Sequence, residues 1–181
     1  TQALQLAQIG RNTPAPVGGI IVRDKAGEPT GILLNRATTL MEPAIPKPSI
    51  EKMAEYIHAG SEQMLRDGFV AAHDAGSTED HIAAMQFLQA DHNLPIRLYA
   101  MLSARSATLS AQWQKRGPLT DPNGFLDVRS VKAYYDGALG SRGARLLADY
   151  SDLPGHRGAG GDGYGFDAKV VDGLISAGFQ V

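Results

Sequence analysis

A single lysine lies inside a strand-like run, and it is the side chain with the clearest chemical potential in this sequence. Lys132 falls within Val128–Tyr135, and Asp136 follows the run directly. Because strand side chains alternate between faces, we expect Lys132 and Asp136 on one face and Val131 on the other. An ammonium group facing a packed interior is costly unless it is paired, neutralised or used in chemistry. The residues also allow a lysine whose stem lies along apolar surface while its ammonium reaches water.

Further candidate groups lie at the end of a second strand-like run, Phe69–His73. His73 and Asp74 could orient a substrate or pair with each other, and a histidine at a strand end also fits a structural role. Asp136 could hold a metal ligand through a hydrogen bond, or it could cap a turn. The sequence contains no cysteine, which excludes disulfides and thiolate metal sites and is compatible with a cytoplasmic protein.

Composition and glycine spacing narrow the function classes. The net charge of −2 and the pI of about 6.2 argue against nucleic-acid binding, which calls for a basic patch. No apolar run approaches the ~20 residues of a membrane span. Glycines after a strand can hold phosphate at a helix amino terminus, so Gly137–Gly143 raises a nucleotide-binding alternative. Its spacing matches neither G-x-G-x-x-G nor G-x-x-x-x-G-K-[ST], which disfavours that alternative.

Four ordered segments carry a family resemblance. VKAYYDGALGSRGARLLADYSDLPG (131–155) is similar to a "VK-x-x-x-DGALGSRGA" signature followed by "YSD-x-PG", and GFVAAHDAG (68–76) to a "GxTxxHDAG" strand. PVGGIIVRDKAGEPTGILLNRA (16–37) is similar to "PxGGxIxRDxxGxPTGxLxExA", and TQALQLAQIGRNTP (1–14) to "NSxALxxAGIxxxTP". Together these segments resemble the YtcJ-like branch of the amidohydrolase superfamily over most of the chain.

The resemblance implies a metal-dependent (β/α)₈ TIM barrel. Members of the superfamily take metal ligands from a His-x-His on strand one, a lysine, often carboxylated, on strand four, histidines on strands five and six, and an aspartate on strand eight. This sequence has no His-x-His, and Lys132 is the only position that the resemblance carries over as a metal ligand. We therefore expect a divalent metal, zinc, in an intact parent protein, and no tightly bound metal in this chain alone.

Length and element order suggest an internal fragment with an α/β fold. A complete barrel needs roughly 250 residues, whereas this chain has 181. We expect residues 1–48 to form a β-rich insertion and connector with a small amino-terminal hairpin, and residues 49–181 to form a partial TIM barrel. Its strands two to five are expected in parallel order at Phe69–His73, Ile96–Leu102, Val131–Tyr135 and Phe179–Val181.

Periodicity and capping residues predict the remaining elements. Amphipathic helices are expected at Ile50–Asp67, Thr78–Ala90, Ser106–Arg116 and Asp167–Ala177, with Ser49 as the cap of the first. Strands are expected at Gly19–Arg23 and Gly31–Leu34, an extended connector at Met41–Ser49 and a glycine-rich loop at Gly155–Gly165.

The expected function is hydrolysis of amide-type C–N bonds, with N-acyl or N-formyl compounds as the substrate class. The parent would act on a small molecule, without nucleic acid or membrane, and this fragment would be inactive alone. His73, Asp74 and Asp136 are the expected catalytic residues, with His73 close to Lys132 at one mouth of the barrel. Uncovered sheet edges would favour self-association. The alternative is a non-catalytic α/β fragment or binding module.

Overall fold

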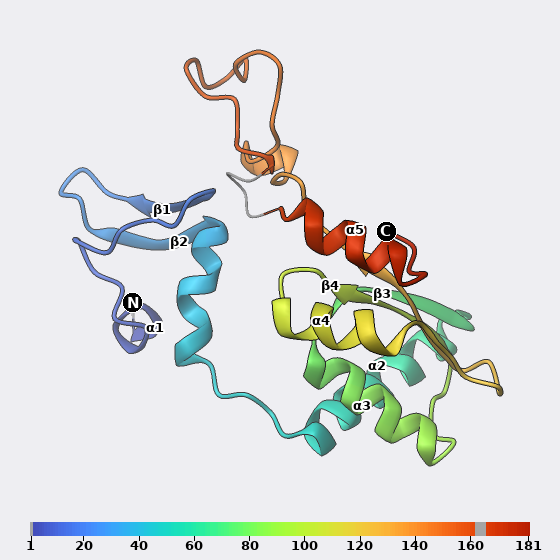
Figure 1. The fold of residues 1–181 in the computed structure, drawn as a ribbon. Helices are drawn as coiled ribbons and strands as arrows, with labels where there is room; N and C mark the ends of the chain where they lie inside the picture. Colours follow the sequence, from blue (N-terminus) through green and yellow to red (C-terminus); the bar gives the residue numbers. More distant parts are fainter. Residues whose placement is uncertain (1, 162–165) are drawn as a thin grey trace. The chain divides into compact units, whose positions relative to one another are not determined.

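The computed structural model describes residues 2–161 and 166–181 (Figure 1). It divides into two compact units, one formed by Thr1–Lys47 with Tyr134–Phe166 and the other by Pro48–Ala133 with Asp167–Val181. The expected division placed all of residues 49–181 in one domain. In the structure, the segment Tyr134–Phe166 instead packs with the amino-terminal residues.

The second unit is built on a parallel sheet. Its strands are β3 (Ala71–Ser77), β4 (Arg97–Ser103) and β6 (Leu126–Lys132), and the sheet order is β3-β4-β6-β5. Strand β5 (Leu119–Thr120), which the sequence did not predict, pairs antiparallel with β6. The expected parallel order of three strands is thus confirmed, but the expected bounds Val131–Tyr135 are wrong, because β6 ends at Lys132. The fourth expected strand is present only as a single parallel bridge between Ser130 and Gln180.

The predicted helices of this unit are confirmed to within two residues at each end. They are α2 (Ile50–Arg66), α3 (Glu79–Ala90), α4 (Ala107–Arg116) and α5 (Ala168–Ser176). A side-chain oxygen caps each amino terminus by accepting a backbone N–H, and the caps are Ser49, Thr78, Ser106 and Asp167. Across the described ranges, no helix combines the length and apolar character needed to cross a membrane.

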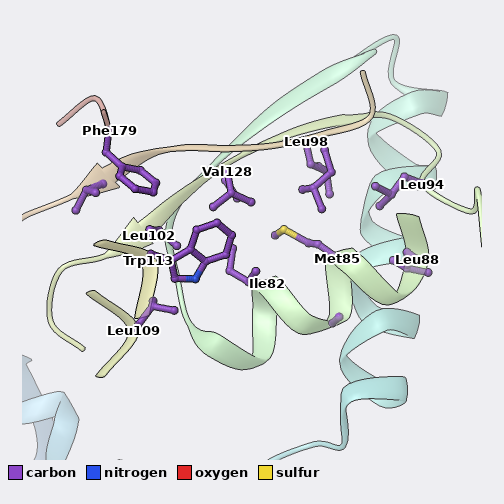
Figure 2. Packing of buried hydrophobic residues seen from close by; sticks show 14 of the residues in the cluster. Ile82, Met85, Leu88, Leu94, Leu98, Leu102, Leu109, Trp113, Val128 and Phe179 are labelled. Carbon is purple, nitrogen blue, oxygen red and sulfur yellow. The ribbon is translucent and has the colours of Figure 1, made fainter. Parts of the chain in front are cut away.

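One face of the parallel sheet packs against helices and forms the main core (Figure 2). Leu98 and Leu102 of β4 lie in this cluster beside Met85 of α3 and Trp113 of α4. Tyr99 and Met101, which alternate with the buried residues of β4, are less buried, as expected when alternate side chains point to opposite faces. We call this second side of the sheet, which carries Tyr99, Met101 and Ser103, the open face.

The first unit begins with a short helix and a hairpin. Helix α1 (Gln2–Leu6) precedes β1 (Gly19–Arg23) and β2 (Pro29–Asn35), which pair antiparallel as predicted. A small separate core contains Leu4, Ile9, Ile21 and Ala37.

The extended connector expected at Met41–Ser49 is wrong in its first part. A 3₁₀ helix, η1 (Arg36–Ala44), occupies that region and contains Pro43. Two threonine hydroxyls close its first turns, because Thr38 Oγ1 donates to Asn35 O and Thr39 Oγ1 donates to Arg36 O, each at 2.9 Å. Such local hydrogen bonds favour a tight turn over an extended chain.

The described residues between Tyr134 and Gly161 are largely irregular and include a short 3₁₀ helix, η2 (Leu139–Ser141). Two ion pairs fasten this segment, Arg142–Asp152 at 2.6 Å and Arg157–Asp149 at 2.7 Å. The glycine-rich loop predicted at Gly155–Gly165 falls partly here, and its residues 162–165 lie outside the described part of the chain.

Candidate functional site

Lys132 lies at the carboxyl end of the parallel sheet. It is the last residue of β6, is half-buried, and is the register partner of Ser103, the last residue of β4. Register partners share a face, so Lys132 lies on the open face with Ser103. In parallel α/β barrels, catalytic groups lie at this end of the strands.

A one-residue irregularity in β6 decides which face Lys132 occupies. Ala100 pairs with Val128 but Met101 pairs with Ser130, so Arg129 is the extra residue. Strict alternation from the buried Val128 would turn Lys132 toward the helices. The extra residue reverses the alternation, because one inserted position exchanges the two faces of a strand. Val131 is therefore buried in the core and Lys132 faces the open side.

The expected proximity of His73 and Lys132 is wrong. His73 is the third residue of β3 and is the partner of Tyr99, which in turn is the partner of Asp127. Ser103, the partner of Lys132, follows Tyr99 by four positions in β4 (103 − 99), so His73 lies roughly 13 Å below the level of Lys132 at ~3.3 Å per residue. The cause is the length of β3, which continues four residues past His73 (77 − 73) to Ser77.

His73 belongs instead to a polar row on the open face, formed by His73, Tyr99 and Asp127 on three adjacent strands. The ring centroids of His73 and Tyr99 are 4.9 Å apart, and the angle between the ring planes is 34°. Tyr99 Oη donates a hydrogen bond to Gln180 Oε1. Within residues 2–161 and 166–181, the buried Asp127 Oδ1 has no hydrogen-bond partner. Sequence reasoning missed this row, although the alternation in Arg97–Ser103 was the signal for Tyr99.

Asp74 faces away from His73, so the two side chains do not pair as the sequence allowed. Asp74 is the register partner of Ala100, a residue of the helix-covered core. Its carboxylate is used locally, since Ser77 Oγ donates to Asp74 Oδ2 at 2.5 Å. Asp74 therefore holds the end of β3, and any catalytic role for it stays a prediction.

Asp136 lies in the first unit and organises the loop that follows Lys132. Its Oδ2 accepts a hydrogen bond of 2.9 Å from the Arg145 amide, and its backbone forms an antiparallel bridge with Gly160. This geometry fits the turn-organising interpretation of Asp136. Its catalytic role stays a prediction.

The glycine-rich stretch after β6 does not form a phosphate cradle. The amide of Gly137 donates to Gly143 O, and the amide of Gly143 donates to Ala138 O. The helical turn between them, η2, has only three residues. Amides engaged with carbonyls, and a turn this short, leave little of the N–H array that phosphate binding requires.

The metal-ligating residues of this chain do not complete a metal centre. Among the described residues, no group of three or more His, Asp or Glu side chains is placed to hold an ion. A zinc centre generally takes three or four protein ligands. Lys132 is thus a candidate for one position of a centre rather than for the whole of it.

Comparisons with known proteins give a consistent assignment. Residues 1–172 match the model of a family described as the amidohydrolase family. The chain is 32% identical to the YtcJ protein of Bacillus subtilis over 161 residues, which covers 86% of this chain and 30% of YtcJ. It is also 32% identical to the protein LONG AFTER FAR-RED 3 of Arabidopsis thaliana over 168 residues, covering 86% of this chain and 28% of that protein. An N-substituted formamide deformylase of Arthrobacter pascens is 32% identical over 100 residues, covering 53% of this chain and 18% of the deformylase.

Two solved structures share the fold. Both are described as uncharacterized metal-dependent hydrolases, from Pyrococcus horikoshii and Pyrococcus furiosus, and each has a TM-score of 0.71 and 21% identity. They cover 97% and 99% of this chain, which spans 34% and 36% of their own lengths. The chain thus spans about a third of these structures and 30% or less of the curated relatives.

Proposed function

The chain belongs to the amidohydrolase family, and we propose that it contributes to a metal-dependent hydrolase of amide-type C–N bonds. The observation that carries the proposal is the position of Lys132. It ends strand β6 on the open face, at the edge of the sheet where barrel enzymes place their catalytic groups. The substrate class is N-acyl or N-formyl compounds, and the name of the Arthrobacter pascens relative supports it.

The proposed architecture is a part of a (β/α)₈ barrel. In this assignment β3, β4 and β6 are barrel strands two, three and four, and Gln180 begins strand five. The open face is then the barrel interior, and the amino-terminal residues 1–48 are an insertion between strands one and two. The remaining strands and ligands belong to a longer protein.

Lys132 would take part as a carbamate. A protonated ammonium has no lone pair for a metal, whereas the neutral amine can add CO₂ and become an anionic oxygen donor. A divalent metal, zinc in our proposal, supplies polarisation of the scissile carbonyl and a more acidic bound water when it is present. The carboxyl end of β6 directs Lys132 to that position, and the other ligands come from outside these residues.

The test uses the longer protein that contains this segment, loaded with Zn²⁺ or Mn²⁺ and assayed on N-formyl and N-acyl amines. Lys132→Ala should lower kcat/KM at least about a hundredfold, because it removes a metal ligand. Short carboxylates such as propionate should restore part of that loss by filling the place of the carbamate. Lys115→Ala, which removes an exposed lysine of α4, is the matched control and should leave kcat/KM unchanged.

Two results would contradict the proposal. Failure of the metal-loaded protein to hydrolyse any amide, formamide or ester would rule out the reaction class. Full activity of Lys132→Ala would remove Lys132 from the metal centre while leaving the reaction class intact.

A further inference from the structure

A cavity of about 160 Å³ lies within the first unit, between residues of the hairpin and residues of the loop after β6. Three polar side chains line it, those of Asn35, Arg142 and His156, together with the glycines Gly18, Gly143 and Gly158. None of these residues belongs to the carboxyl end of the parallel sheet. The cavity is large enough for several water molecules or one small organic group.

The wall of the cavity is built from unusual backbone conformations. Asn35 has φ 52° and Arg142 has φ 57°, both in the left-handed region that non-glycine residues seldom occupy. Gly158 has φ +72°, and a Cβ there would lie 2.1 Å from Ala144 O. Strained conformations persist where surrounding contacts hold them, and they are concentrated at functional sites.

Specific contacts hold each polar side chain in place. Ser141 Oγ donates to Asn35 Oδ1 at 2.6 Å, which leaves the amide group Nδ2 of Asn35 as a donor. His156 Nε2 lies 2.7 Å from Arg142 O. Since a carbonyl can only accept, Nε2 carries the hydrogen and Nδ1 is the acceptor of the neutral ring. Neither Asn35 Nδ2 nor His156 Nδ1 has a hydrogen-bond partner in the described part of the chain.

The charges around the cavity are already balanced. The Arg142 guanidinium contacts Asp152 Oδ2 through Nε at 3.0 Å and through Nη2 at 2.6 Å. Nearby, Arg157 pairs with Asp149, which also accepts the Gly155 amide. Among the described residues that line the cavity, the charged side chain of Arg142 already has a counter-charge, so the arrangement favours an uncharged ligand.

We propose that this cavity is a binding site for small uncharged amides, with the ligand carbonyl accepting from Asn35 Nδ2 and the ligand N–H donating to His156 Nδ1. An amide carries an acceptor oxygen and a donor nitrogen on the same carbon, which matches the donor Asn35 Nδ2 and the acceptor His156 Nδ1 of the lining. Binding requires neither Lys132 nor a metal, so this proposal can be tested independently of the hydrolase function.

The test is an NMR titration of the 181-residue chain in buffer with a metal chelator, using N-methylacetamide as the probe. We expect saturable shifts of the Asn35, Gly143 and Gly158 backbone amides, with a Kd of about the millimolar range that such small ligands reach. Acetate and methylammonium, which have similar size but carry a charge, should bind at least about tenfold more weakly.

Asn35→Asp provides the decisive variant. It keeps the oxygen that accepts from Ser141 and replaces the free donor by a second acceptor, so the probe should bind at least about tenfold more weakly. Asn123→Asp makes the same change at an exposed asparagine of the other unit and should not affect binding. If Asn35→Asp loses the dispersed spectrum of a folded chain, His156→Gln replaces it, with the same expected loss.

Three outcomes would overturn the proposal. Shifts that grow linearly without saturation would show that no defined site exists. Saturable shifts confined to the parallel sheet would place the ligand elsewhere. Binding that is unchanged in Asn35→Asp or His156→Gln, or that is tighter for acetate than for the amide, would reject the proposed contacts.

Discussion

Lys132 and Ser103 are register partners at the carboxyl ends of two neighbouring parallel strands, whereas His73 lies level with Tyr99, four residues earlier in β4 (103 − 99). His73 of β3 and Lys132 of β6 therefore lie on the same open face but at different positions along the strand direction. Lys132 lies at the carboxyl end of its strand, which would be the mouth of the proposed barrel, and His73 lies within the sheet. Because of this separation, we expect substitutions of His73 and of Lys132 to have different effects on activity.

In the proposed longer hydrolase, His73→Asn should leave kcat/KM within about fivefold of the wild-type value. His73 contacts the Tyr99 ring at 4.9 Å, and loss of such an aromatic pair costs about 0.5–1.5 kcal/mol of stability. Steady-state kinetics and urea unfolding of the same variant separate the two effects. A loss of activity as large as that of Lys132→Ala, without a change in metal content, would contradict this expectation and support the catalytic role first predicted for His73.

Local sequence patterns predicted which helices and strands form better than they predicted how residues on neighbouring strands align. The helices follow from apolar periodicity and from caps such as Ser49, both of which are encoded within a few residues. The end of β3 was missed because Asp74 and Gly76 are residues typical of turns. In the structure a register shift between Ala75 and Ser77 absorbs Gly76, whose φ is +113°, and the strand continues.

The site depends even more on tertiary pairing. The sequence predicted that Lys132 and Val131 lie on opposite faces of the strand, and the structure confirms this. It did not predict the extra residue Arg129, which is needed to bring Lys132 to the open face. The height of His73 relative to Lys132 follows from pairing between β3, β4 and β6, which no short segment encodes. The cavity at Asn35 was likewise not foreseeable, because Asn35 and Ser141 are 106 residues apart.

The 181-residue chain alone should neither hold stoichiometric zinc nor hydrolyse amides. A single lysine carbamate reverts readily to the amine when no metal retains it, and the described residues offer no group of three ligands to bind one. Elemental analysis after dialysis against Zn²⁺, with an activity assay on N-formyl amines, checks this. One zinc per chain, together with hydrolysis that Lys132→Ala abolishes, would contradict it.

Replacing Trp113 by alanine should destabilise the second unit strongly. Trp113 is 4% exposed and packs edge-on against Phe179 at 6.3 Å, so it joins α4 to the carboxy-terminal segment (Figure 2). Trp→Ala substitutions in cores cost about 3–5 kcal/mol. Urea unfolding should show this loss, whereas Ile175→Ala, at a residue that is 51% exposed, should cost less than about 1 kcal/mol. Equal losses in both variants would contradict the packing described here.

The loop after β6 should lose order in acid. The hydrogen bond from Arg142 lowers the pKa of Asp152, and the hydrogen bonds from Arg157 and the Gly155 amide lower the pKa of Asp149. A carboxylate with a lowered folded-state pKa contributes stability above its unfolded pKa of about 4, and that contribution is lost as the pH falls through the folded pKa.

The amide resonance of Gly155, which donates to Asp149 Oδ2 at 2.8 Å, reports this titration directly. We expect its shift to change at a pH below about 4 in the wild type, and to be largely independent of pH in Asp149→Asn. Asp172→Asn, at an exposed carboxylate of α5, should retain the wild-type titration. A Gly155 shift that titrates equally in Asp149→Asn would show that the hydrogen bond is not its cause.

The outer edge of β3 should cause the isolated chain to self-associate. β3 is the terminal strand in the order β3-β4-β6-β5, and a groove of about 330 Å³ lined by Met53, Ile57 and Met64 of α2 runs beside it. An unpaired strand edge next to apolar side chains is a template for pairing with another chain. Sedimentation velocity should therefore show an average mass that rises with protein concentration.

Ala75→Lys, which adds a charge to an exposed position of β3, should keep the chain monomeric, because lysine on an edge strand opposes pairing. Ala111→Lys adds the same charge to an exposed position of α4 and should associate as the wild type does. A wild-type chain that stays monomeric at all concentrations, or equal association of both variants, would show that another surface, or none, mediates contact between copies.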